Sequence, residues 1–264
     1  MLKVENIEFS YGTEKVLQNI SFEINKGSFC GIIGPNGSGK TTLIKILVKI
    51  LRQKKGRITL EGRETRLIPA GEYAKKISYL PSITELPFSY TVEEFVMLGR
   101  FPYIGRYGRV SKEDRNIVEM ALEQLGINKH RRKKVWELSD GEKQRVFIAQ
   151  VLAQQSSVII LDEPTSHLDI GHSFRIMDII KEVNREGITV ITVLHDLNLA
   201  SEYCTQLFLL NNGKIFAKET PEEVITYQNI EAVYNTKVLV YTHPHRKRPH
   251  VFGISSAFMS DVKQ

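Results

Sequence analysis

The chain has 264 residues, of which 42% are apolar and 25% are charged, and its net charge is +6 at neutral pH. These values are typical of a globular protein whose core needs no disulfide staples. No stretch of about 18 consecutive apolar residues exists, so we expect no bilayer-spanning helix. The charged N-terminus lacks the apolar core of a signal peptide, so we expect none.

The two cysteines indicate the redox compartment of the protein, and two basic runs indicate which partners it could bind. Cys30 and Cys204 lack metal-ligand spacing, and free thiols fit a reducing compartment. The basic runs, "KHRRKK" at 129–134 and "HPHRKRPH" at 243–250, are not interleaved with aromatic residues. Solvated loops are therefore favoured over a surface for nucleic acid or lipid headgroups. A metal site at His243, His245 and His250 is opposed by the neighbouring Arg and Lys, and a hairpin loop is the better interpretation.

Strand and helix patterns alternate along most of the chain. Alternating or continuously apolar runs predict strands at 3–12, 16–24, 28–34, 56–62, 75–81, 158–161 and 188–194. Mostly apolar or amphipathic runs predict helices at 40–51 and 171–186, and Asn212-Gly213 predicts a hairpin turn. From about Thr91 to Leu138 the pattern is helical, with capping-box spacing at Thr91/Glu94 and Ser111/Asp114. A β/α body therefore holds a helical insert at about 85–145.

"GPNGSGKT", at 34–41, has the spacing of a phosphate-binding loop, with a predicted strand before it and a helix after it. Gly34, Gly37 and Gly39 let the backbone wrap round phosphate oxygens. Lys40 supplies a charge to the β- and γ-phosphates, and Thr41 offers a hydroxyl to Mg²⁺. A chance glycine turn is the alternative, and the flanking elements argue against it.

Two carboxylates and a histidine follow buried strands further along. Asp162 ends one strand, where it suits Mg²⁺, and Glu163 comes next, where it suits orienting a water for attack on the γ-phosphate. His195 follows the next strand and is a candidate hydrogen-bond donor to the γ-phosphate or the water. Alone, His195 would be read as a structural hydrogen-bonding residue.

A second helix start in the same chain also suits an anion. Ser139 caps a helix predicted within "LSDGEKQRVFIAQVL", and Glu142 lies at capping-box spacing. Such a start offers free N–H groups and the positive end of a dipole. The chain therefore carries two separate anion-binding helix starts.

These ordered motifs resemble the ATP-binding cassette family, the ATPases that drive ABC transporters. The resemblance covers essentially the whole chain. It implies an α/β, P-loop NTPase (RecA-like) core with an N-terminal antiparallel β-subdomain and an inserted α-helical subdomain. One ATPase domain at 1–264 is then expected, with the core and β-subdomain at about 1–84 and 146–240, the helical subdomain at about 85–145 and a C-terminal β-hairpin tail at about 237–264.

The resemblance also implies roles for individual residues. Tyr11 would stack on adenine, and two cassettes would pair head to tail, each signature helix capping the nucleotide of the other chain. The nucleotide-binding residues would be Tyr11, Gly34, Pro35, Asn36, Gly37, Ser38, Gly39, Lys40, Thr41 and Thr42. The signature would be Leu138, Ser139, Asp140, Gly141 and Glu142, and the short loop after Glu163, the D-loop, would act through Ser166, Leu168 and Asp169.

Two positions depart from the family pattern. The usual signature is LSGGQ, and this chain has Asp140 and Glu142 in place of a glycine and the glutamine. A carboxylate near a γ-phosphate is costly unless it points away. Ser82 stands where the family has a glutamine that reaches Mg²⁺ and the attacking water. A serine hydroxyl ligates Mg²⁺ with shorter reach, so we expect lower turnover or weaker coupling.

The helical insert is similar to cassettes that power uptake of iron-siderophore, haem or cobalamin. Integral membrane permease subunits would then dock at Phe88, Tyr90, Phe101, Pro102 and Tyr103, unless these aromatics fill the insert's own core. The resemblance implies ATP and Mg²⁺ as cofactors, a place at the cytoplasmic face of the membrane, and indirect action with a substrate-binding protein. The cargo touches no residue of a cassette, and another metal or small-molecule cargo stays open.

Two other functions compete with the transport ATPase. A soluble ABC ATPase acting on nucleic acid or ribosomes usually carries a long coiled coil or two cassettes, and this chain has neither. We therefore expect no nucleic-acid partner. A regulatory ATP-binding module is opposed by the intact Lys40, Asp162, Glu163 and His195.

Overall fold

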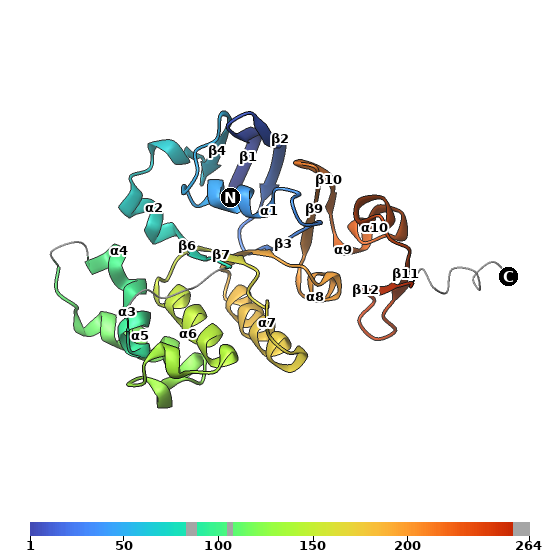
Figure 1. Cartoon of the computed structure of the whole chain (residues 1–264). Helices are drawn as coiled ribbons and strands as arrows, with labels where there is room; N and C mark the ends of the chain where they lie inside the picture. Colours follow the sequence, from blue (N-terminus) through green and yellow to red (C-terminus); the bar gives the residue numbers. More distant parts are fainter. Residues whose placement is uncertain (83–88, 105–107, 256–264) are drawn as a thin grey trace. The chain divides into compact units, whose positions relative to one another are not determined.

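The computed structural model describes residues 1–82, 89–104 and 108–255. The chain divides into two compact units, whose elements are labelled in Figure 1. The terminal unit comprises Met1–Gly62 and Ile191–Gln264, and the middle unit comprises Arg63–Val190. Among the described residues, no helix combines the length and the apolar character that crossing a bilayer requires.

An antiparallel sheet opens the terminal unit. Strand β1 (Leu2–Tyr11) pairs with β2 (Glu14–Ile24) and with β4 (Lys55–Leu60). Leu2 faces both Ile24 and Leu60, and all three side chains are buried. The alternating pattern of the sequence thus predicts this half-buried sheet correctly.

A second set of strands carries the phosphate loop. Strand β3 (Phe29–Ile33) pairs in parallel with β9 (Gln206–Asn211), which pairs antiparallel with β10 (Lys214–Glu219). Every residue of β3 is buried, as its apolar run predicts. The turn between β9 and β10 is the predicted Asn212-Gly213 pair, and both residues adopt the positive φ of a tight hairpin turn, 47° and 73°.

Helix α1 (Lys40–Leu47) is shorter than the sequence predicts. The apolar run continues to residue 51, but the helix ends at Leu47 and Lys49 adopts a φ of 64°. A left-handed residue cannot continue an α-helix, so the remaining apolar residues leave the helix axis.

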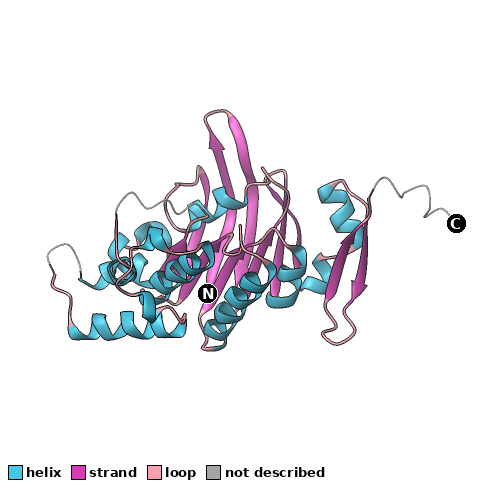
Figure 2. Cartoon of the chain, turned by 60° about the horizontal axis from the view of Figure 1, so that its bottom comes forward, coloured by secondary structure: helices cyan, strands magenta, loops and turns pink. Residues whose placement is uncertain are grey.

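The last third of the chain completes the terminal unit. Strand β8 (Thr189–Val193) is wholly buried and leads the chain into it from the middle unit. Strands β11 (Val238–Thr242) and β12 (Pro249–Gly253), drawn as a magenta pair in Figure 2, form a hairpin. Its loop holds residues 243–248 of the histidine-rich run, and His243 N donates to Arg248 O across it. The pairing of β11 with β12 confirms the hairpin interpretation of this run. The elements are α8 (Leu197–Tyr203), α9 (Pro221–Val224), α10 (Tyr227–Tyr234), β11 (Val238–Thr242) and β12 (Pro249–Gly253).

The middle unit contains two parallel strands. Strand β6 (Ile77–Leu80) pairs with β7 (Val158–Asp162), with Ile77 beside Val158 and Leu80 beside Leu161. Both strands therefore end at the same edge. The shorter elements that precede this pair and connect the helices are β5 (Arg63–Glu64), α2 (Ala70–Lys76), α4 (Phe101–Ile104) and the 3₁₀ turns η1 (Thr65–Leu67), η2 (Leu98–Arg100), η3 (Asn128–His130) and η4 (Val135–Glu137).

Three helices of the middle unit pack on one another (Figure 1): α3 (Val92–Met97), α5 (Lys112–Gln124) and α6 (Asp140–Ala153). Phe95 of α3 is buried and its ring lies 5.3 Å from that of Phe147 of α6, so Phe95 fills the core between these two helices. Reciprocal capping boxes at Thr91/Glu94 and Ser111/Asp114 start α3 and α5, which confirms both predictions. Helix α7 (Ile170–Arg185) follows β7.

Candidate functional site

The phosphate loop lies between β3 and α1 in the terminal unit. Gly34 has a φ of 143°, and a Cβ atom there would lie 2.2 Å from the carbonyl oxygen of Leu210. At Gly39, with a φ of 101°, a Cβ atom would lie 2.7 Å from Leu17 Cδ2. Only glycine fits at these two positions, and the backbone therefore remains uncovered for a ligand.

Lys40 and Ser38 give this loop its chemistry. The Lys40 side chain is buried, and its Nζ donates to the carbonyl oxygens of Gly34 at 2.8 Å and Pro35 at 2.9 Å. The buried Ser38 hydroxyl has no hydrogen-bond partner within the part of the chain that the structure describes. A buried ammonium, a buried hydroxyl and glycine-rich backbone N–H groups are the donors that a phosphate takes. The loop therefore fits a nucleotide phosphate.

The other nucleotide candidates of the terminal unit differ in exposure: Thr42 is buried, whereas Tyr11 and His195 are exposed. Tyr11 ends β1 and is 48% exposed, and its ring is nearly perpendicular to that of Phe9, with 4.9 Å between the centroids. Thr41 and Thr42 lie in the first turn of α1. His195 is exposed after β8, directly before Asp196, which caps α8.

Asp162 is the last residue of β7 in the middle unit and is 1% exposed. Tyr79 of the neighbouring strand β6 hydrogen-bonds to it. Burial, followed by the Asp162 charge and this hydrogen bond, raises the pKa of Tyr79 to about 12. A buried carboxylate is usual where it is paired or coordinates a metal, so Asp162 fits a Mg²⁺ ligand. Ser82 is exposed just after β6, at the edge where β7 also ends.

Glu163 has an unusual backbone conformation. Its φ is 57°, in the left-handed region that non-glycine residues seldom occupy. Ser166 of the following loop donates its hydroxyl to Glu163 Oε2 at 3.0 Å. Strained backbone of this kind is concentrated at functional sites, and here it sets the direction of a candidate catalytic carboxylate.

The start of α6 is a reciprocal capping box, as the sequence predicts. The backbone N–H and the hydroxyl of Ser139 donate to Glu142 Oε2, at 3.0 Å and 2.9 Å. These two bonds, followed by the nearby charges of His130 and Arg145, hold the pKa of Glu142 below its ordinary value. The Asp140 carboxylate accepts from Lys143 at 3.3 Å, so its charge is paired along the helix.

His130 is a residue that the sequence reasoning missed. It lies in the basic run expected to be a solvated loop, but its side chain is 11% exposed and its Nε2 lies 3.0 Å from Glu142 Oε1. In the same run, Arg131 pairs with Glu93 at 2.8 Å. The solvated-loop expectation is therefore wrong for His130, whereas Arg131 stays partly exposed. No local signal could have identified the His130 contact, because it joins side chains twelve positions apart that belong to different elements, η3 and α6.

The candidate docking residues divide into three groups. Phe88 lies outside the described residues. Tyr90 is partly buried, with its ring 6.5 Å from that of Phe95. Phe101 is 63% exposed and Tyr103 is 38% exposed beside the partly buried Pro102, so this short helix presents aromatic surface.

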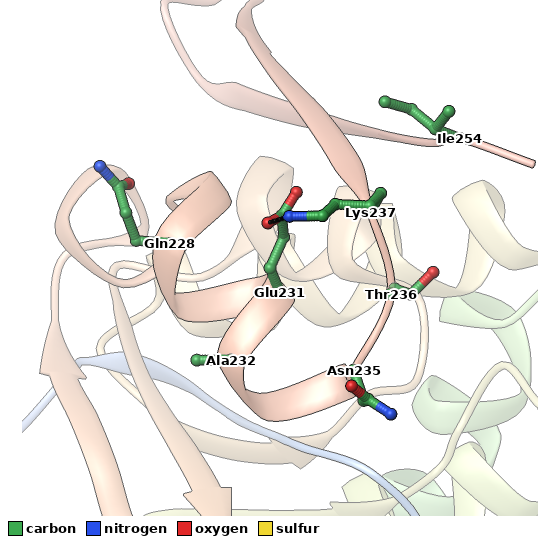
Figure 3. A pocket seen from close by; sticks show the side chains of 7 residues that line it. All are labelled: Gln228, Glu231, Ala232, Asn235, Thr236, Lys237 and Ile254. Atoms are coloured by element: carbon green, nitrogen blue, oxygen red, sulfur yellow. Dashed lines mark hydrogen bonds and ion pairs between the residues drawn. The ribbon is translucent and has the colours of Figure 1, made fainter. Parts of the chain in front are cut away.

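A further hollow of the terminal unit lies around the end of α10. Figure 3 shows Glu231 and Lys237 joined by an ion pair within it. Because its two charged side chains neutralise each other, the hollow lacks the cationic character of the phosphate loop. It is lined by Gln228, Glu231, Ala232, Asn235, Thr236, Lys237 and Ile254.

A glycine-lined loop closed round a lysine, between a buried parallel strand and a helix start, defines a P-loop nucleotide-binding protein. Residues 17–166 match the family model described as ABC transporter. The chain belongs to the ABC transporter family and is one of its ATPases.

Relatives and solved structures agree with this assignment. The chain is 38% identical over 251 residues to the ferric enterobactin transport ATP-binding protein FepC of Escherichia coli (strain K12), covering 95% of this chain and 93% of FepC. It is 40% identical over 252 residues to the uncharacterized ABC transporter ATP-binding protein YvrA of Bacillus subtilis (strain 168), covering 95% of this chain but 57% of YvrA. A solved structure described as an inward-facing metal-chelate type ABC transporter matches with a TM-score of 0.86 at 25% identity, covering 98% of this chain and 99% of that one.

Proposed function

We propose that the chain is the ATP-hydrolysing subunit of an importer that takes up an iron chelate, haem or cobalamin. The observation that supports the ATPase part is the phosphate loop. Its backbone, with two positions where only glycine fits, lies around the buried side chains of Lys40 and Ser38. The names of FepC and of the metal-chelate type transporter support the cargo class. Residues of about 85–145 form the permease-facing subdomain in this proposal, with Phe101, Pro102 and Tyr103 as contacts.

The phosphate loop holds the nucleotide, with the backbone of residues 34–39 and Lys40 on the phosphates and Tyr11 on the adenine. Stacking of this kind contributes about 1–3 kcal/mol per base. Thr41, Asp162 and Ser82 would hold Mg²⁺, which neutralises phosphate charge when it is bound.

Hydrolysis requires a water aligned with the γ-phosphate. Glu163 accepts a hydrogen bond from this water and orients it, and His195 donates to the γ-phosphate. Lys40 stabilises the charge that develops on the phosphate oxygens as the bond to ADP breaks.

The second anion site of the chain serves another copy. Ser139 and the N-terminus of α6 cap the γ-phosphate that the partner's loop holds, and the D-loop residues Ser166, Leu168 and Asp169 line the same interface. The N-terminus of a helix supplies the dipole and the N–H groups that an anion needs. ATP therefore clamps two copies head to tail, and hydrolysis releases them.

The complex acts at the membrane in this proposal. Two cassettes dock on permease subunits at the cytoplasmic face, and a substrate-binding protein delivers the cargo. The proposal includes no nucleic-acid partner for either of the two basic runs.

The first test is the solution mass of the Glu163→Gln variant with and without MgATP, measured by light scattering. Removing the water-orienting carboxylate traps ATP, so we expect the mass to double when MgATP is added. A variant that binds ATP and remains monomeric would contradict the head-to-tail assignment. ATP hydrolysis by the complex reconstituted with its permease separates a transport ATPase from a regulatory module.

A further inference from the structure

His172 connects two segments of the middle unit that the proposed function assigns to the partner's nucleotide. Asp169 caps α7: its Oδ1 accepts from the His172 backbone N–H at 2.8 Å, and its Oδ2 lies 2.8 Å from His172 Nδ1. These bonds also hold the pKa of the Asp169 carboxylate below its ordinary value. The imidazole is thus fixed at one edge by the last residue of the D-loop.

The other edge of the imidazole meets the signature glycine. A Cβ atom built on Gly141 would lie 2.7 Å from His172 Cδ2 and 3.1 Å from His172 Nε2. A Cβ atom at this distance would force the ring to shift, and the hydrogen bond between Nδ1 and Asp169 opposes that shift even though both side chains are partly exposed. Gly141 adopts no left-handed φ, so the constraint on this position comes from the ring and not from the backbone conformation.

A cap alone does not require this arrangement. The Asp169 side chain already satisfies a free backbone N–H of α7 through Oδ1, which is the ordinary contribution of a cap residue. The second bond, to the ring, adds a rigid planar spacer between the D-loop and the start of α6. Gly141 and His172 are 31 positions apart, so this contact exists only through tertiary packing.

We propose that His172 is a positioning residue that fixes the signature glycine Gly141 relative to the D-loop, so that both segments approach the partner's nucleotide as one body. The inference rests on the proposed head-to-tail dimer. His172 itself touches neither the reacting atoms nor the chain's own phosphate loop. Its loss should therefore weaken ATP-dependent pairing and leave the binding of ATP by a single chain unchanged.

The test uses the full chain in the Glu163→Gln background. We expect His172→Ala to bind ATP with the affinity of the parent and to weaken the MgATP-dependent dimer about tenfold, a change of about 1.4 kcal/mol in pairing. Arg175→Ala, at an exposed residue of the same helix, is the matched control and should pair like the parent. Dimerisation of His172→Ala at the parent concentration would overturn the proposal.

A double-mutant cycle separates positioning from a general loss of folding. Gly141→Ala inserts a methyl group against the fixed ring and should also weaken pairing. Adding His172→Ala makes room for that methyl group, so the double variant should pair better than Gly141→Ala alone. Strictly additive losses would show that the ring does not act through Gly141, and would also overturn the proposal.

A measurement on the monomer tests the role of His172 even if no dimer forms. If the Glu163→Gln parent fails to pair, the proposed function fails, but hydrogen exchange still tests His172. The amides of residues 138–144 should exchange faster in His172→Ala than in the parent or in Arg175→Ala, because the start of α6 has lost its support. Unchanged exchange there would overturn the positioning role.

Discussion

Arg100 forms a buried ion pair that connects the helices of the middle unit. It is 4% exposed, and its Nε donates to Asp114 Oδ1 at 2.9 Å. Its Nη1 donates to the carbonyl oxygen of Ala153 at 2.8 Å and to Gln155 Oε1 at 3.0 Å. The guanidinium also lies 4.0 Å from the centroid of the Tyr103 ring. One side chain therefore joins the start of α5 to the end of α6 and to a proposed docking residue.

Arg100→Met removes this cation and leaves the carboxylate of Asp114 behind. Loss of one member of a buried pair costs about 3–5 kcal/mol of unfolding free energy. Asp114 keeps the Ser111 hydroxyl and backbone N–H, at 2.7 Å and 3.0 Å, so we expect the lower end, about 3 kcal/mol. Arg100→Met combined with Asp114→Leu should cost less than the sum of the two single changes, because no unpaired buried charge remains.

The stability cost of Arg100→Met should depend on pH in a defined direction. Hydrogen bonds from Ser111, followed by Arg100, hold the pKa of Asp114 below its ordinary value. A lowered folded-state pKa contributes stability above the unfolded value of about 3.9, and this stability is lost as the pH falls through the folded value. The difference between the wild type and Arg100→Met should therefore be complete at pH 7 and shrink below about pH 4.

Urea unfolding measures the effect through Trp136, the single tryptophan, which lies in the same unit. Arg132→Met, at an exposed arginine, is the control and should change stability by less than about 0.5 kcal/mol. A cost below about 1 kcal/mol for Arg100→Met at pH 7, or strict additivity in the double variant, would refute the reasoning.

Three further predictions concern the site and the core. Lys40→Ala removes charge-assisted bonds of about 1.5–3 kcal/mol, so calorimetry should show nucleotide binding weakened roughly 10- to 150-fold, and affinity within threefold of the wild type would exclude a phosphate ligand at this position. Ser82→Gln places a longer side chain towards Mg²⁺ and should change the ATPase rate or its Mg²⁺ dependence. If neither changes, the hypothesis that the short Ser82 side chain lowers turnover is wrong. Burial raises the pKa of Cys30 to about 12, and Cys204 is buried too, so a thiol reagent at pH 8 should modify both only in urea, and rapid labelling of the native protein would contradict this burial.

Features held within a few residues could be predicted from the sequence. The capping boxes at Thr91, Ser111 and Ser139 each join residues three positions apart, so the bonds follow from local spacing. The Asn212-Gly213 turn and the glycine-rich loop are equally local, because they depend on which residues tolerate positive φ. Family membership followed from these motifs and their order along the chain.

Features that depend on packing between distant segments could not be predicted. Helix α1 ends at Leu47 although apolar residues continue, and Glu163 adopts a left-handed φ that its sequence does not favour. The contact of His130 with Glu142 joins residues in different elements.

The sequence by itself determined the family, the phosphate loop and the helix starts, since each rests on hydrogen bonds and backbone preferences spanning a few residues. Only the tertiary structure decided that His172 lies against Gly141 with its ring fixed by Asp169. Residue types and spacing carry no information on which face of α7 meets the start of α6. That contact joins residues 31 positions apart, so no local backbone preference or short-range hydrogen bond encodes it.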